Sequence, residues 1–229
     1  MADLSAAQAR LGLAFKNLEY LEEALTHRSY LNEHKTARAH NERLEFLGDA
    51  VLELAATNFL FVRFPNKPEG DLTAYRAALV NTGSLAETAE RIGLNDLLLL
   101  SKGESKDTGR ARQIILANAF EAVLGALYLD QGYAATEAFV AMHLYPKIEG
   151  VLANRTWQDA KSKFQEAAQE KKGVTPLYKT LQETGPDHDK KFTVGVFLGP
   201  QDEVARGEGK SKQEAEQDAA HNALQKTGW

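Results

Sequence analysis

Three acidic side chains fall on one stripe of a predicted helix within residues 40–54, HNERLEFLGDAVLEL. Glu42, Glu45 and Asp49 are spaced i, i+3 and i+7, and at about 100° per residue this spacing puts their carboxylates on the same side. The stripe is compatible with an ordinary solvated face. It is also compatible with a cation site, because Mg²⁺ and Mn²⁺ prefer oxygen ligands. The apolar face opposite is predicted to contain Leu44, Leu47, Val51, Leu54 and Ala55.

A second helix carries two polar residues in an apolar setting. Residues 114–129, IILANAFEAVLGALYL, are apolar or small apart from Asn118 and Glu121. A helix that is apolar all round is buried, and a buried carboxylate needs a proton or a cationic partner. Glu121 therefore either forms a buried ion pair with Arg43 or Arg76, or shares a bound cation with the acids of the first helix. The second alternative requires the two helices to cross.

Composition bounds the class of protein. The chain has 229 residues, no cysteine and a net charge of −5. The lack of cysteine fits a reducing compartment, and we expect a cytoplasmic protein without a membrane span or a signal peptide. Neither half has the basic excess typical of a nonspecific nucleic-acid binder, so a nucleic-acid site would have to be a local patch.

The hydrophobic pattern predicts two domains. Residues 1–152 show helical spacing nearly throughout, which favours an all-α domain. Residues 157–227 follow the order helix, three antiparallel strands, helix, which is an α+β arrangement. Residues 150–157 are expected to form a short flexible linker. The expected elements of the second domain cover residues 159–172, 176–182, 191–198, 203–207 and 211–226, with a turn-rich segment at 183–189.

Five stretches of the first domain stand out: THRS at 26–29, ERLEFLGD at 42–49, EGD at 69–71, RAALV at 76–80 and EA at 121–122. In order and spacing they resemble the ribonuclease III family of double-stranded RNA endonucleases. The resemblance implies the family's all-α endonuclease fold and a homodimer. It also implies Mg²⁺-dependent hydrolysis of duplex RNA to 5′-phosphate and 3′-hydroxyl ends, with Mn²⁺ as a substitute and no organic cofactor. Ribosomal precursor, messenger and other structured RNAs would be the substrates.

The resemblance also implies roles for single residues. Catalytic roles fall on Glu42, Glu45, Asp49 and Glu121, and metal ligation falls on Glu42, Asp49, Asn118 and Glu121. Asn118 departs from the family, which commonly has Asp there; an amide oxygen can ligate Mg²⁺ but brings no charge. Glu69 of the EGD stretch is assigned to the substrate-binding set.

Phe46 stands among the acids, where a solvated face would not place an aromatic ring. In the family this aromatic packs into the partner subunit, so the resemblance assigns Phe46 to the dimer interface. The alternative is that Phe46 packs within its own subunit.

The second domain contains DAKSKFQE at 159–166, GPDHDKKF at 185–192 and GKSK at 209–212. With these stretches it resembles a double-stranded RNA-binding domain, which recognises A-form shape and 2′-hydroxyl groups. Lys161, Lys163 and His188 have a plainer alternative, as solvated-face or turn residues. The RNA-binding residues implied by the resemblance are Gln165, Glu166, His188, Lys210 and Lys212.

The leading hypothesis is therefore a metal-dependent endonuclease for double-stranded RNA. The rival hypothesis is a protein that binds double-stranded RNA on the same scaffold without cutting it, and Asn118 is the residue in its favour. A third class, degenerate members with structural roles, would be expected to lose several of the acids, and here five stand: Glu42, Glu45, Glu69, Asp49 and Glu121.

Overall fold

The computed structural model describes residues 3–34, 39–153, 160–186 and 190–229, and the chain divides into two compact units, residues 1–157 and 158–229. The described part of unit 1 is helical throughout, with one isolated bridge between Thr26 and Leu99. Its α-helices are α1 (Leu4–Leu11), α2 (Leu18–Leu25), α3 (Arg28–Glu33), α4 (Glu42–Arg63), α5 (Glu69–Val80), α6 (Thr82–Arg91), α7 (Arg110–Gln131), α8 (Tyr133–His143) and α9 (Lys147–Ala153), with 3₁₀ turns at Leu94–Asp96 and Glu104–Lys106.

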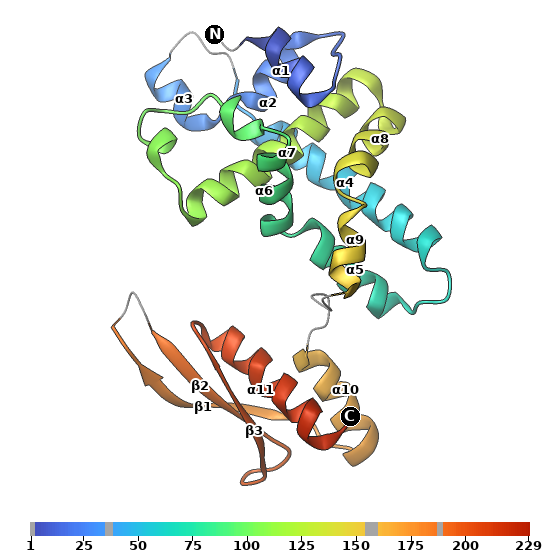
Figure 1. Cartoon of the computed structure of the whole chain (residues 1–229), viewed down its shortest axis with the longest axis vertical. Coiled ribbons are helices and arrows are strands. Elements are labelled where there is room, and N and C mark those ends of the chain that lie inside the picture. The colour runs from blue at the N-terminus through green and yellow to red at the C-terminus, as the bar shows by residue number, and fades with distance from the viewer. Residues whose placement is uncertain (1–2, 35–38, 154–159, 187–189) are drawn as a thin grey trace. The chain divides into compact units, whose positions relative to one another are not determined.

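Two long helices, α4 and α7, cross at the centre of unit 1 (Figure 1). Glycine makes the close approach possible at two points. A Cβ atom on Gly48 would lie 1.7 Å from the carbonyl oxygen of Glu121, and one on Gly125 would lie 2.1 Å from that of Leu44. The two backbones are therefore in direct contact, and side chains next to these glycines on either helix are forced together.

α7 is the core helix of unit 1. Among the described residues it alone is long and apolar enough to cross a membrane by length and composition, but 61% of its apolar window is buried inside the protein. Phe120, Val123, Leu124 and Leu127 are fully or almost fully buried. The prediction of a buried helix around Glu121 is confirmed.

The apolar face predicted for α4 is correct at three of its five residues, and Leu47 is only half-buried. Leu44, Val51 and Ala55 are buried, but Leu54 is exposed. Leu52 and Leu60, which were not on the predicted face, are buried. The buried side of α4 is wider than one stripe because this helix packs against α5 and α8 as well as α7.

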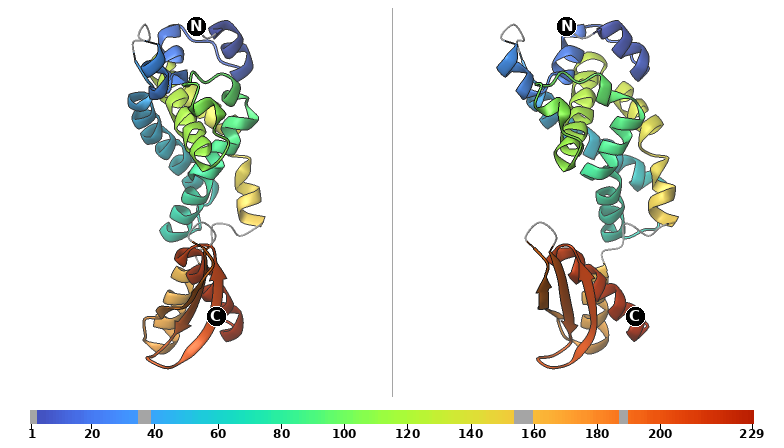
Figure 2. Two further views of the ribbon diagram at one scale, coloured as in Figure 1. Left: turned by 90° about the vertical axis from the view of Figure 1, so that its left-hand side faces the viewer. Right: turned by 60° about the vertical axis from the view of Figure 1, so that its left-hand side comes forward.

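Unit 2 places two helices on one face of a three-stranded sheet (Figure 2). The antiparallel strand order is β1-β2-β3, and Val194 at the centre pairs with Thr180 on one side and Gly207 on the other. This is the predicted α-β-β-β-α domain. Its elements are α10 (Ala160–Lys172), β1 (Leu177–Thr184), β2 (Lys191–Phe197), β3 (Glu203–Gly209) and α11 (Lys212–Thr227).

Two local expectations need correction. β1 continues to Thr184, so the turn expected from residue 183 begins later. Residues 150–153 of the expected linker belong to α9, because Gly150 is tolerated inside that helix, and residues 154–157 lie outside the described residues. Ser211 caps the last helix, since its hydroxyl accepts a hydrogen bond from the Glu214 amide at 3.1 Å.

Candidate active site and nucleic-acid interface

The crossing of α4 and α7 brings together the acids of both helices. Glu45 and Asp49 flank Gly48 on α4, and Glu121, whose carbonyl touches Gly48, lies opposite on α7. The carboxylates of Glu45 and Asp49 both act electrostatically on Glu121. We call Glu42, Glu45, Asp49 and Glu121 the acid cluster.

Glu121 lies in an unfavourable place for a negative charge. Burial, followed by the charges of Asp49, Glu45 and Glu53, raises the pKa of Glu121 to about 8. The alternative of an ion pair between Glu121 and Arg76 is wrong, because the Arg76 guanidinium binds Glu53, with Nε 2.8 Å from Oε2. Within the described residues no ion pair joins Arg43 or any other cation to Glu121. Without an added cation, this carboxyl therefore keeps its proton up to about pH 8.

Asn118 takes part in the cluster as a hydrogen-bond donor. Burial and the charge of Glu42 raise the pKa of the Glu45 carboxyl, and a hydrogen bond from the Asn118 side chain opposes that rise. Because the amide nitrogen donates to Glu45, the amide oxygen of Asn118 stays available as an acceptor or ligand. The substitution of amide for carboxylate therefore removes one repulsion beside Glu45.

Glu42 is turned toward basic side chains. Its carboxylate lies 3.3 Å from Arg28 Nη1 and 3.8 Å from His40 Nδ1. Across the described ranges, no three His, Asp or Glu side chains converge closely enough to form a ready-made metal site. The predicted ligands thus lie around one crossing, but Glu42 would have to leave Arg28 to join the others at a single ion.

A cavity opens beside the acid cluster, between α4, α7 and the chain that enters α3. It contains Glu42, Glu45 and Asn118 of the predicted set. Asp49 and Glu121 do not line it. No functional role was predicted from sequence for the other residues that line the cavity, although His27 and Arg28 belong to the matching THRS stretch. These other residues are His27, Arg28, Asn41, Glu104, Ala111, Ile114 and Ile115.

The segment before α4 is anchored at this cavity by backbone contacts. The Asn41 amide donates to the carbonyl of Thr26 at 2.9 Å, and the buried Asn41 side chain donates to Ala24 at 3.4 Å. His27 caps α3, and burial lowers the pKa of its imidazole, with Glu104 acting in the opposite direction. His27 and Arg28 are therefore held beside the first turn of α4.

Two predicted residues of unit 1 stand apart from the crossing. Glu69 lies in the first turn of α5 and accepts a hydrogen bond from the Thr73 hydroxyl at 2.9 Å. No contact among the described residues joins Glu69 to the acid cluster. Phe46 is 81% exposed, so the alternative that its ring packs within its own subunit is wrong.

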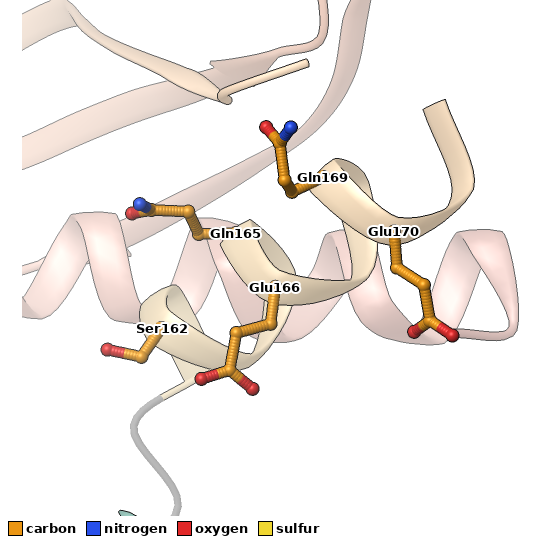
Figure 3. Close-up of a pocket in the computed structure, with 5 residues that line it drawn as sticks. All are labelled: Ser162, Gln165, Glu166, Gln169 and Glu170. Atoms are coloured by element: carbon orange, nitrogen blue, oxygen red, sulfur yellow. The ribbon is translucent and has the colours of Figure 1, made fainter. Parts of the chain in front are cut away.

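In unit 2 the predicted RNA-binding residues Gln165 and Glu166 project from the outer face of α10 (Figure 3). They line a shallow hollow with three residues that were not predicted. The spacing i, i+3, i+4 could have identified those three, since it continues the same helical face. We call the following set the α10 face: Ser162, Gln165, Glu166, Gln169 and Glu170.

The predicted lysines stand at the start of α11. Lys210 and Lys212 flank the cap residue Ser211 and are exposed, and Lys212 Nζ lies 3.0 Å from Glu183 of β1. Lys161 is not a free surface charge, because its ammonium contacts Glu216 at 2.6 Å and lies over the ring of Tyr178. His188 lies outside the described residues.

Comparison with known proteins agrees with this division. A family model described as ribonuclease-III-like matches residues 17–148, and the double-stranded RNA binding motif matches residues 160–227. A ribonuclease 3 of Enterococcus faecalis is 45% identical, covering 94% of this chain and 93% of the relative. A ribonuclease 3 of a Geobacillus species is 48% identical, covering 96% and 89%.

Among solved structures, the nuclease domain of ribonuclease III from Campylobacter jejuni matches unit 1. The match has a TM-score of 0.57 and 37% identity, and covers 63% of this chain and 99% of that domain. The Campylobacter nuclease domain is described as structurally flexible in a region involved in dimer formation.

Proposed function

The chain belongs to the ribonuclease III family and is a ribonuclease with a double-stranded RNA binding motif, and on this premise we propose that it cuts duplex RNA by divalent-metal-dependent hydrolysis at the acid cluster. The observation that carries the proposal is Glu121: a partly buried carboxylate on the core helix, with three acids acting on it. Such an arrangement raises the free energy of the folded protein, which indicates a functional site.

The donor set fits a hard divalent cation. Carboxylate and amide oxygens are the ligands that Mg²⁺ and Mn²⁺ take, and the set contains neither sulfur nor a convergent histidine pair that would favour zinc. A cation beside Glu121 would also offset the repulsion that raises the pKa of this carboxyl to about 8. Glu42, Asp49 and Glu121 would hold the ion, and Asn118 would contribute its amide oxygen.

The bound ion and the residues of the chain would have separate roles in the reaction. A bound Mg²⁺ would lower the pKa of a coordinated water and offset charge on the phosphate being cut. Asn118 holds Glu45 in place through its side-chain hydrogen bond, so Glu45 can orient a water molecule at the edge of the cavity. Hydrolysis that breaks the bond to the 3′ oxygen leaves 5′-phosphate and 3′-hydroxyl ends.

We further propose a homodimer acting on ribosomal precursor, messenger and other structured RNAs in the cytoplasm. Phe46, Leu54 and Phe61 are exposed along one side of α4, and exposed apolar side chains in a row favour a protein partner. A second copy of this chain would bury them. Light scattering of the native chain and of Phe46→Glu measures this, since the charged variant is expected to be monomeric and a monomeric native chain would contradict the proposal.

The test of cleavage is a gel assay of a long RNA duplex with the purified protein. The reactions contain Mg²⁺, Mn²⁺ or a chelator, with native chain and Asn118→Asp in parallel. We expect the native chain to cut with either metal and to stop with chelator. End-labelling of the products distinguishes 5′-phosphate from 5′-hydroxyl ends. Failure to cut with every metal would contradict the proposed reaction.

Asn118 favours one rival function, binding of duplex RNA without cleavage. If the Asp that is common at this position in the family accepts a proton during the reaction, the amide cannot replace it. The same assay decides, because a binding protein would shift the duplex without cutting it and would gain cleavage in Asn118→Asp.

A further inference from the structure

The imidazole of His27 is fixed at one edge by the helix that it caps. His27 is the N-cap of α3, and its Nδ1 accepts from the Ser29 amide at 3.3 Å. The same Nδ1 lies 2.8 Å from the Ser29 hydroxyl. These two contacts set both the position and the orientation of the ring.

The hydrogen-bond chain also decides which ring nitrogen carries the proton. The Ser101 amide donates to the Ser29 hydroxyl oxygen at 3.1 Å, so that hydroxyl can give its own hydrogen to His27 Nδ1. With two donors directed at Nδ1, the neutral ring carries its hydrogen on Nε2. Nε2 also carries a hydrogen in the protonated ring, so this donor is present whatever the charge of the imidazole.

His27 lines the same cavity as Glu42, Glu45 and Asn118. Three other side chains with N–H groups in its walls each have one contact with a protein acceptor: Arg28 Nη1 with Glu42, Asn41 with Ala24 and Asn118 with Glu45. In the part of the chain that the structure describes, His27 Nε2 has no such acceptor. An oriented donor thus faces a cavity whose acidic walls would repel a phosphate.

We propose that His27 is a substrate-positioning residue, whose Nε2–H donates a hydrogen bond to a backbone oxygen of duplex RNA next to the bond that is cut. The acceptor is a nonbridging phosphate oxygen or a ribose 2′-hydroxyl. An uncharged donor suits this place because it attracts RNA without forming an ion pair with the acids that hold the metal. The inference rests on the function proposed above, since it needs RNA at the acid cluster.

Two substitutions of His27 separate its role as the N-cap of α3 from its role as a hydrogen-bond donor at Nε2. In His27→Asn the side-chain oxygen takes the place of Nδ1 and keeps the cap, because Asn is a favoured N-cap residue, but the group at Nε2 is lost. In His27→Gln the side-chain amide reaches the place of Nε2 and keeps the donor, but the favoured cap is lost. We expect His27→Asn to keep the native melting temperature and to lose about tenfold in kcat/KM for a short duplex, chiefly through KM. His27→Gln is expected to melt lower but to keep most of kcat/KM.

The reverse pattern would overturn the inference: normal cleavage by His27→Asn, or losses in both variants that follow their losses in stability. If the native chain cuts RNA and His27→Asn cuts equally well, this inference fails alone. If the native chain cuts no RNA, the proposed function and this inference fail together.

Modified duplexes then identify the acceptor. Duplexes carrying one methylphosphonate or one 2′-deoxy sugar at successive positions near the cut are compared between native chain and His27→Asn. At the contacted position the modification slows the native chain and leaves His27→Asn unaffected. A methylphosphonate effect identifies phosphate, and a deoxy effect identifies the 2′-hydroxyl. An equal effect on both proteins at every position would overturn the inference.

Discussion

The acid cluster of unit 1 lies where two helices cross, whereas the α10 face of unit 2 lies along the outside of one helix. In unit 1 the backbones of α4 and α7 meet at Gly48 and Gly125, and the carboxylates of Glu45 and Glu121 are partly removed from water. In unit 2 the five polar residues follow helical spacing along a solvent-facing side. The first site therefore depends on packing between elements far apart in sequence, and the second needs only that α10 be helical and docked.

Their energetics differ for the same reason. Moving like charges together out of water lowers stability, so the acid cluster exists at a cost that ligand binding can reverse. Polar side chains on an exposed helix face change stability little. Function and stability should thus be coupled at the acid cluster and separate at the α10 face.

The largest effect is expected from Gly48→Ala. The added Cβ would stand 1.7 Å from the backbone oxygen of Glu121, and a backbone atom cannot rotate away. The helices must move apart, which we expect to cost about 3 kcal/mol of unfolding free energy or more and to abolish cleavage. Chemical denaturation and the duplex-cutting assay measure the two effects.

Gly150→Ala is the matched control, because this glycine is also helical and nothing lies within 4 Å of its added Cβ. Alanine there should stabilise the protein by about 0.5–1 kcal/mol and leave cleavage unchanged. Equal behaviour of the two variants would show that the close crossing is not what assembles the site.

The next effect is a pH-dependent gain in stability from Glu121→Gln in metal-free protein. Burial and neighbouring acids raise the pKa of Glu121 from 4.5 to about 8, so between these values the folded state binds more protons than the unfolded state. Native stability therefore falls as pH rises through this window. Above pH 8 the variant should be more stable than the native chain by about 2 kcal/mol. The full rise from 4.5 to about 8, at roughly 1.4 kcal/mol per pKa unit, would correspond to about 5 kcal/mol. The expected gain is smaller because water reaches part of the carboxylate.

Denaturation at several pH values, with chelator and with Mg²⁺, measures this gain. Mg²⁺ should stabilise the native chain at high pH and the variant much less, while cleavage by the variant falls about a hundredfold or more. Parallel pH curves for the two proteins without metal would contradict a charged, destabilising Glu121.

How far the sequence could predict each site follows from this contrast. Helical periodicity placed Gln165 and Glu166 on one face and Glu42, Glu45 and Asp49 on one stripe, since both patterns are local. It could not place Glu121 against Gly48, because a crossing depends on which backbone atoms fit against one another. The partner of Arg76 was missed for the same reason, because its pairing with Glu53 depends on how α5 packs against α4.

His27 belongs to a matching motif but had no predicted role. Its ring orientation depends on Ser101, 72 positions beyond Ser29 in the chain, and no spacing rule links them. Phe46 is a different case: the local pattern left packing within its own subunit open, and only the folded structure shows that its ring is exposed.

The smallest effect is expected from Gln165→Ala on the α10 face. Loss of about one neutral hydrogen bond, near 1 kcal/mol, weakens RNA binding about fivefold. The side chain carries no charge, so the dependence of affinity on salt should not change. The unfolding free energy should also stay native, because Gln165 is exposed and alanine favours helices.

Gln225→Ala, exposed on α11 away from this face, serves as the control and should bind RNA as the native chain does. Titration of a duplex in the absence of divalent metal measures the affinity, and the cutting rate at saturating RNA should be unchanged. Gln165→Ala would thus alter binding without stability or chemistry, whereas Glu121→Gln alters stability and chemistry together. A variant of Gln165 that slowed cutting at saturation would show that the two sites are not separable.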